Sequence, residues 1–162
     1  MPKFLVGRDL DLFKSFAREL VETVIQNTVV LFKVNLRETK VNIYGESVNK
    51  TWHPGVELYA LIDMEPETVV YEGFGPENTQ NMTFKFDRDL CEERNAYPEI
   101  GDIIYFDRNY YEIDNTNEIQ FVGGLPGTEN ETEAGYDRRN WSIICSTFMV
   151  SKSNLNIEER IN

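Results

Sequence analysis

The apolar residues of this chain change their spacing once, and that change limits the folds open to it. Between residues 9 and 26 they recur every three or four positions, which predicts an amphipathic helix. Asp9 is placed to cap its start, and Asn27-Thr28 to end it. From Val29 onward apolar residues recur at every second position, which predicts β-strands. The sequence therefore predicts one N-terminal helix followed by a β-rich core.

The apolar stripe of that helix is typical of a face that packs on a core. The pattern also fits a helix that packs on a neighbouring subunit, and both alternatives stay open. The members of the stripe are Phe13, Phe16, Ala17, Leu20, Val21, Val24 and Ile25.

Short runs with strand patterns come next, separated by turn signals rich in glycine and proline. Residues 82–87 alternate most cleanly, with Met82, Phe84 and Phe86 expected to face inward. Residues 141–150 are apolar on both sides, as in a central strand. This pattern predicts a mainly β fold, a small barrel or sandwich of short antiparallel strands with one N-terminal amphipathic helix. The predicted strands are 29–34, 41–44, 56–63, 69–73, 82–87 and 141–150, together with a hairpin within 101–115.

A chain of 162 residues, 41% of them hydrophobic, is long enough for one full core, so we expect a single domain over 1–162. Residues 123–140 are rich in glycine and spaced glutamates, and are predicted to form a long acidic loop. The expected parts are the helix 9–26, the β core 29–122, the loop 123–140, the core strand 141–150 and the C-terminal tail 151–162.

The stretch GDIIYFDRNYYEIDN, residues 101–115, carries four carboxylates: Asp102, Asp107, Glu112 and Asp114. We predict a hairpin with a three-residue loop at 107–109, which pairs Tyr105 with Tyr111 and Ile103 with Ile113. These four residues would form one apolar face of cross-strand pairs. Asp102 would then oppose Asp114, and a metal ion could only be bound there. We interpret the stretch as structural.

The decapeptides FDRDLCEERN, 86–95, and FDRNYYEIDN, 106–115, match at five positions. Two copies do not make a repeat architecture. We interpret them as two strand ends with similar turn chemistry.

Charge and composition exclude several functions. The net charge is −12, with +2 on residues 1–40 and −14 on the rest, which disfavours general nucleic-acid binding. Cys91, Cys145 and the single His53 cannot supply a zinc site, and no cofactor is expected. No run approaches eighteen apolar residues and the start lacks a signal-peptide core, so we expect no membrane segment. Because no complete catalytic set is present, and Glu38-Thr39-Lys40 lacks the upstream acid of a nuclease motif, we do not expect an enzyme.

Two longer segments resemble a known family. NIYGESVNKTWHPGVELYALID, followed by YPEIGDIIYFDRNYYEID, resembles the neck proteins of contractile-tailed bacteriophages, with YGES at 44–47 and a GD-I-IYF…EI hairpin at 101–113. The resemblance covers about residues 40–122. It implies a structural virion protein that forms a homo-oligomeric ring at the head–tail junction. DNA would pass through this ring without specific binding. It also implies assembly in the host cytoplasm and contacts with other head–tail connector proteins and tail terminator or sheath-end proteins.

In such a ring the working residues would lie at interfaces, where aromatic residues are enriched. We expect three regions: the aromatic hairpin, the loop before the last strand, and the tail, which could extend a neighbour's sheet. The candidates are Tyr105, Phe106, Tyr110 and Tyr111; Tyr136, Arg138, Arg139 and Trp141; and Leu155 and Ile157.

Two alternatives remain at this point. One is a β-barrel module that binds a peptide or small ligand through its aromatic face. A monomer with a deep apolar cavity would favour this alternative. The other is a metal-dependent hydrolase that uses Asp102, Glu112 and Asp114.

Overall fold

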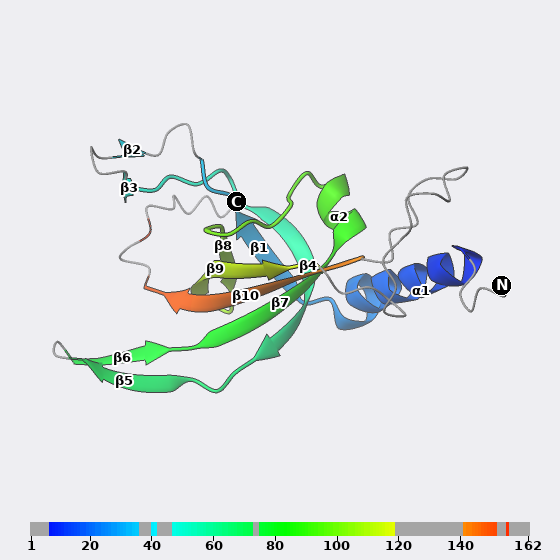
Figure 1. Ribbon diagram of the computed structural model, residues 1–162. Helices are drawn as coiled ribbons and strands as arrows, with labels where there is room; N and C mark the ends of the chain where they lie inside the picture. The colour runs from blue at the N-terminus through cyan, green and yellow to red at the C-terminus, as the bar shows by residue number, and fades with distance from the viewer. Residues whose placement is uncertain are drawn as a thin grey trace.

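Six antiparallel strands close into a barrel in the computed structural model, which describes residues 7–35, 40–41, 47–72, 75–118, 141–151 and 155 (Figure 1). Their order around the barrel is β1-β4-β7-β10-β9-β8, and the β1–β8 ladder completes the closure. The expected mainly β fold with one N-terminal helix is therefore confirmed. The barrel strands are β1 (Thr28–Phe32), β4 (Val56–Met64), β7 (Asn81–Asp87), β8 (Ile103–Phe106), β9 (Asn109–Asn117) and β10 (Ser142–Val150).

Smaller elements project from this barrel. Two separate two-stranded sheets are formed by β2 (Lys40–Val41) with β3 (Ser47–Asn49), and by β5 (Thr68–Glu72) with β6 (Gly75–Thr79). The helices are α1 (Gly7–Glu19), which continues into the π-helical turn η1 (Leu20–Ile25), and α2 (Arg88–Glu93). Within the described residues, no helix is long and apolar enough to cross a membrane.

The barrel interior is filled by alternate residues of its strands, as the period of two requires. Met82, Phe84 and Phe86 of β7 are all buried, which confirms the inward face predicted for that strand. The Phe84 ring lies 6.4 Å from that of Phe86, 6.2 Å from that of Phe106 and 5.8 Å from that of Tyr111. This aromatic cluster sits at the centre of the core. Strand β10 was expected to be buried on both faces. It is not buried on both faces throughout, because Phe148 keeps 41% of its surface exposed.

The expectation that the apolar residues of the N-terminal helix pack on the core is wrong for most of them. Of these residues only Val21 is buried, because the helix meets the barrel through its C-terminal end. There the Gln26 N–H donates to the Val21 carbonyl at 3.1 Å, and the Ala60 N–H donates to the Asn27 carbonyl at 3.0 Å. The rest of α1 extends away from the barrel, as Figure 1 shows.

The two similar decapeptides fold differently. Both begin at a strand end, at Phe86 of β7 and at Phe106 of β8. After the first, the Asp87 carboxylate accepts the Leu90 N–H at 2.9 Å and caps α2, which sequence analysis did not predict. After the second comes a tight turn. The shared sequence therefore marks two strand ends, and tertiary contacts decide whether a helix or a turn succeeds each of them.

The predicted hairpin exists, but its three-residue loop is wrong. The loop has two residues, Asp107 and Arg108, both with positive φ (44° and 67°), as a twisted two-residue turn requires. The ladder consequently pairs Ile104 with Tyr111 and Ile103 with Glu112. This shift by one residue moves Tyr111 into the core and changes which side chains share a face.

Candidate functional site

The acidic end of the hairpin is a structural junction. Asp102 is 2% exposed, and its Oδ1 accepts the Val34 N–H at 2.9 Å while its Oδ2 accepts the Glu99 N–H at 2.9 Å. Lys33 Nζ lies 3.7 Å from Asp102 Oδ2 and 3.2 Å from Glu99 Oε2. Burial raises the pKa of Asp102, and the two N–H donors and Lys33 oppose that shift. The carboxylate thus ties the chain after β1 to the start of β8.

The other two carboxylates proposed for metal chemistry do not form a metal site with Asp102. Glu112 Oε1 is 2.7 Å from Lys50 Nζ, and Asp114 is exposed where the β9–β10 register shifts. The predicted opposition of Asp102 and Asp114 is wrong, because Asp102 is bonded to Ile113 instead: the Ile113 N–H donates to the Asp102 carbonyl at 2.9 Å. Over the described ranges, no three His, Cys, Asp or Glu side chains are grouped so as to hold a metal ion.

The two cysteines are free thiols of the core. Both are 0% exposed, and burial raises the pKa of Cys91 and of Cys145 to about 12. A thiol with so high a pKa is a poor nucleophile at neutral pH. His53, by contrast, is exposed in the stretch before β4, and its N–H donates to the Lys33 carbonyl at 2.8 Å.

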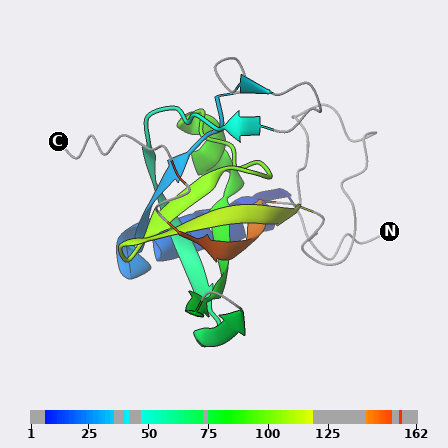
Figure 2. The same ribbon diagram turned by 90° about the vertical axis from the view of Figure 1, so that its left-hand side faces the viewer.

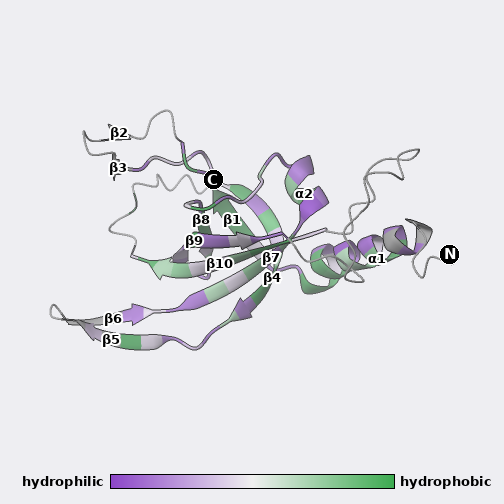
Figure 3. Cartoon of the chain, viewed as in Figure 1, coloured by the Kyte–Doolittle hydropathy of each residue, from purple (hydrophilic) through white to green (hydrophobic). Residues whose placement is uncertain are grey.

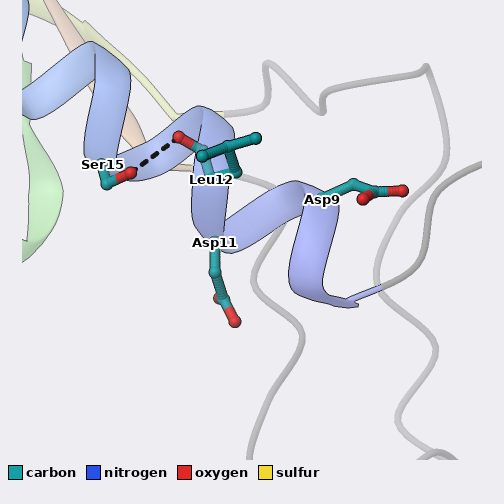
Figure 4. A pocket seen from close by; sticks show the side chains of 4 residues that line it. All are labelled: Asp9, Asp11, Leu12 and Ser15. Carbon is teal, nitrogen blue, oxygen red and sulfur yellow. Dashed lines mark hydrogen bonds between the residues drawn. The ribbon is translucent and has the colours of Figure 1, made fainter.

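A surface hollow lies along the first turns of α1, lined by Asp9, Asp11, Leu12 and Ser15. Figure 4 shows the two carboxylates pointing in different directions, while Ser15 Oγ donates to the Leu12 carbonyl of its own helix at 2.8 Å. This arrangement gives no convergent set of polar groups for a ligand. The interior of the barrel, in turn, is occupied by the buried cluster around Phe84.

The aromatic hairpin residues proposed as interface candidates differ in how far they are buried. Tyr111 is 0% exposed and belongs to the core, and Tyr110 is 5% exposed. Tyr105 and Phe106 are half-buried; the Tyr105 ring lies 5.0 Å from that of Tyr110, and Phe106 packs against the core. Tyr105 and Phe106 therefore retain the accessible surface of this group, and their contact with a neighbour stays a prediction.

The structure describes only some of the remaining interface candidates. Trp141 is half-buried and its carbonyl accepts the Arg88 N–H at 2.8 Å, beside the start of α2. Leu155 is half-buried as well. Tyr136, Arg138, Arg139 and Ile157 lie outside the described residues.

Two apolar surfaces are exposed, of which the sequence pattern had indicated the first, with its partner left open, but not the second. The first, here called the helix stripe, runs along α1 and η1, and the second, the ribbon face, lies on and beside β5. Figure 3 shows apolar residues on both elements. The helix stripe consists of Leu12 (54% exposed), Phe13 (50%), Phe16 (62%), Leu20 (45%) and Val24 (70%), and the ribbon face of Met64 (61%), Val69 (50%) and Tyr71 (81%). A signal was present in the sequence: the apolar arc of the helix is wider than one contact with a core needs.

Comparison with known proteins finds likeness in structure and none in sequence families. No protein-family model matches the sequence, and no curated protein matches it. Among solved structures, the chain is similar to a chain of the virion of a native gene transfer agent particle, with 11% identity, a TM-score of 0.49, and coverage of 76% of this chain and 93% of that one. It is also similar to the protein xkdH of the phage-like element PBSX from Bacillus subtilis, with 9% identity, a TM-score of 0.34, and coverage of 74% and 90%.

Proposed function

We propose that this chain is a structural virion protein that forms an oligomeric ring at the head–tail junction of a contractile-tailed phage. The resemblance to phage neck proteins supports the identity of the particle. Two parts of the matching sequence lie in residues that the structure describes, and both form barrel strands. Residues 56–63 lie in β4, and residues 101–113 form β8 and much of β9. The resemblance therefore maps onto the scaffold of the fold.

The observation that carries the assembly part of the proposal is the position of the large exposed apolar residues. Phe16 and Tyr71 represent two surfaces on elements that protrude from the barrel, and each is more than 60% exposed. Monomeric proteins seldom leave apolar patches of several hundred Å² uncovered, so such surfaces favour contacts with other subunits. A ring protein needs two such surfaces on every copy.

Charge supports a role in which DNA passes without being held. The chain carries −12 overall, and residues 41–162 carry −14. An acidic wall repels phosphate and gives none of the cation contacts on which non-specific DNA affinity depends. Other head–tail connector proteins and tail terminator proteins are the proposed partners above and below the ring, with Tyr105 and Trp141 as candidate contacts.

Two measurements test this function. Light scattering and negative-stain imaging over a concentration series should show rings with a central hole. An antibody raised against the purified chain, applied to particles produced by the genome that encodes it, should label one site between head and tail. Particles that lack the chain, or that carry the label over the whole capsid, would refute the proposal.

Mapping charge onto the assembled ring tests the passage of DNA separately. We expect an acidic or neutral channel wall and no detectable retention of duplex DNA at physiological salt. A basic lumen would contradict this part of the proposal and leave the position in the particle untouched.

A further inference from the structure

The helix stripe is an unpartnered surface of defined length. Leu12, Phe16 and Leu20 succeed one another at four-residue steps, and from Leu12 to Val24 the stripe runs about 18 Å along the helix. The C-terminal turn of the same helix already meets the barrel through Val21. Bonds from Arg18 to Glu93 of 2.9 and 2.7 Å also hold α1 beside α2. The stripe itself is left open to solvent.

The ribbon face has similar dimensions. Val69 and Tyr71 lie two positions apart on β5 and so point to one side of the ribbon. The five pairs from Thr68↔Thr79 to Glu72↔Gly75 make a ladder about 16 Å long. A two-stranded ribbon of this kind is marginally stable in water unless something packs on it.

The two surfaces lie at opposite ends of the molecule. In Figure 1 the β5–β6 ribbon projects from the barrel on one side and α1 on the other, and in Figure 2 the ribbon is in front with the helix behind the barrel. They cannot meet within one chain. A contact between the stripe of one copy and the ribbon face of the next is heterologous, so it repeats from copy to copy and closes a ring if the rotation allows.

The areas suffice for such a contact. With about 150–250 Å² on a large side chain, the exposed fractions leave roughly 550 Å² on the stripe and roughly 400 Å² on the ribbon face. Their sum is on the order of 1,000 Å², where specific interfaces begin.

Charge disfavours the pairing of two ribbon faces more strongly than the pairing of a ribbon face with a stripe. Residues 63–79 hold five carboxylates, Asp63, Glu65, Glu67, Glu72 and Glu77, and no Lys or Arg, whereas residues 7–25, which form the helix, hold three Lys or Arg against four acids. Ribbon against ribbon would oppose two strongly acidic segments. Two stripes packed antiparallel would bring both Glu19 carboxylates together near their centre, since Glu19 lies close to the middle of the stripe. Stripe against ribbon sets the acidic segment against a helix whose net charge is only −1, which is less repulsive than the opposition of two ribbons.

From these observations we infer that the helix stripe of one copy binds the ribbon face of a second copy, and that this contact joins the subunits of the ring. The inference rests on the proposed function, because it names the surfaces by which that ring is built. Phe16 lies near the middle of the stripe, and Tyr71 is the most exposed side chain of the ribbon face.

The test uses complementary variants of the full chain, Phe16→Glu and Tyr71→Glu. A carboxylate buried in an apolar contact should weaken self-association about a hundredfold or more, so each variant alone should stay monomeric where the unaltered chain assembles. An equimolar mixture should form a 1:1 dimer and stop there, because one intact stripe and one intact ribbon face remain. Sedimentation velocity measures both results, and circular dichroism verifies the fold of each variant. Val24→Glu and Val69→Glu serve as second variants of the two surfaces.

Ile100→Glu is the matched control, because Ile100 is 65% exposed and lies outside both surfaces; it should assemble as the unaltered chain does. The inference is overturned if the mixture stays monomeric while the unaltered chain assembles, or if either variant assembles normally. Assembly blocked by Phe16→Glu but not by Tyr71→Glu would indicate a helix–helix contact instead. An unaltered chain that is monomeric at every concentration overturns the inference too, and the antibody labelling of particles then decides independently whether the proposed function stands.

Discussion

The Val34 N–H donates a 2.9 Å hydrogen bond to the buried Oδ1 of Asp102, across 68 positions of sequence. The second carboxylate oxygen accepts the Glu99 N–H at 2.9 Å. Asn at this position keeps one acceptor and turns an N–H₂ toward a donor, so Asp102→Asn should lower the free energy of unfolding by about 1–3 kcal/mol. Urea titration of the variant and the unaltered chain measures this change in the free energy of unfolding. Asp114→Asn, on an exposed residue, should change stability by less than about 0.5 kcal/mol, and equal effects of the two would contradict the assignment.

Asp102 should also contribute to the pH dependence of stability. Burial raises its pKa above the ordinary Asp value of about 3.9, so in the intervening pH range the folded chain binds more protons than the unfolded one. The stability it contributes is fully present below that ordinary value and is lost as pH rises through the raised pKa. Asp102→Asn should remove this downward slope from the plot of unfolding free energy against pH. A variant whose slope is unchanged would show that the carboxyl titrates alike in both states.

The Phe84 ring is fully buried and touches three other rings. Phe84→Ala should reduce stability by about 3–5 kcal/mol, because it removes transfer energy and leaves a cavity. Phe148→Ala is the matched control: Phe148 is 41% exposed, and its truncation should cost about 1 kcal/mol or less. Thermal and urea unfolding measure the stability lost by each variant. Similar losses for the two variants would contradict the central position of Phe84 in the core.

Arg108 holds φ at 67° in the turn between β8 and β9. Arg108→Gly creates Asp-Gly, the dipeptide favoured in such turns, and should raise stability by up to about 1 kcal/mol. Asn109→Gly places glycine one residue later, at the first position of β9, and should lower stability by about 0.5–1 kcal/mol. Urea midpoints measure both changes, and a destabilised Arg108→Gly would argue against the two-residue turn.

The thiols of Cys91 and Cys145 should not react in the native protein. Burial raises both pKa values to about 12, so at pH 8 neither carries a useful thiolate fraction. Ellman's reagent should give no rapid colour with the folded chain, and two equivalents after addition of guanidinium chloride. Rapid reaction of one thiol before denaturant is added would place that cysteine at the surface.

Local spacing determined much of the barrel. The alternation of β4 and β7 fixed which side chains face inward, because the two faces of a strand differ by a single step of sequence. The N-terminal helix was predictable from the three- and four-residue spacing of its apolar residues. These features depend only on neighbours along the chain, and the sequence contains them in full.

The errors arose where distant residues decide. The hairpin loop at Asp107 and Arg108 is one residue shorter than predicted, because pairing with β1 and β10 sets the register that buries Ile104 and Tyr111. The helix at Arg88–Glu93 depends on the cap by Asp87, and the related segment after Phe106 turns instead. Similar segments of sequence thus took different structures in different surroundings.

By itself the sequence determined a β-rich chain with an amphipathic N-terminal helix, an acidic balance and a hairpin rich in aromatic residues. Only the tertiary structure decided which apolar residues are left exposed. Phe16 and Tyr111 both carry large aromatic rings, yet one is 62% exposed and the other 0%. The reason is physical: periodicity shows that a helix or strand has an apolar face, but burial depends on whether the closed barrel has room for it. Here the interior is already filled by its own strands, and the helix stripe remains outside.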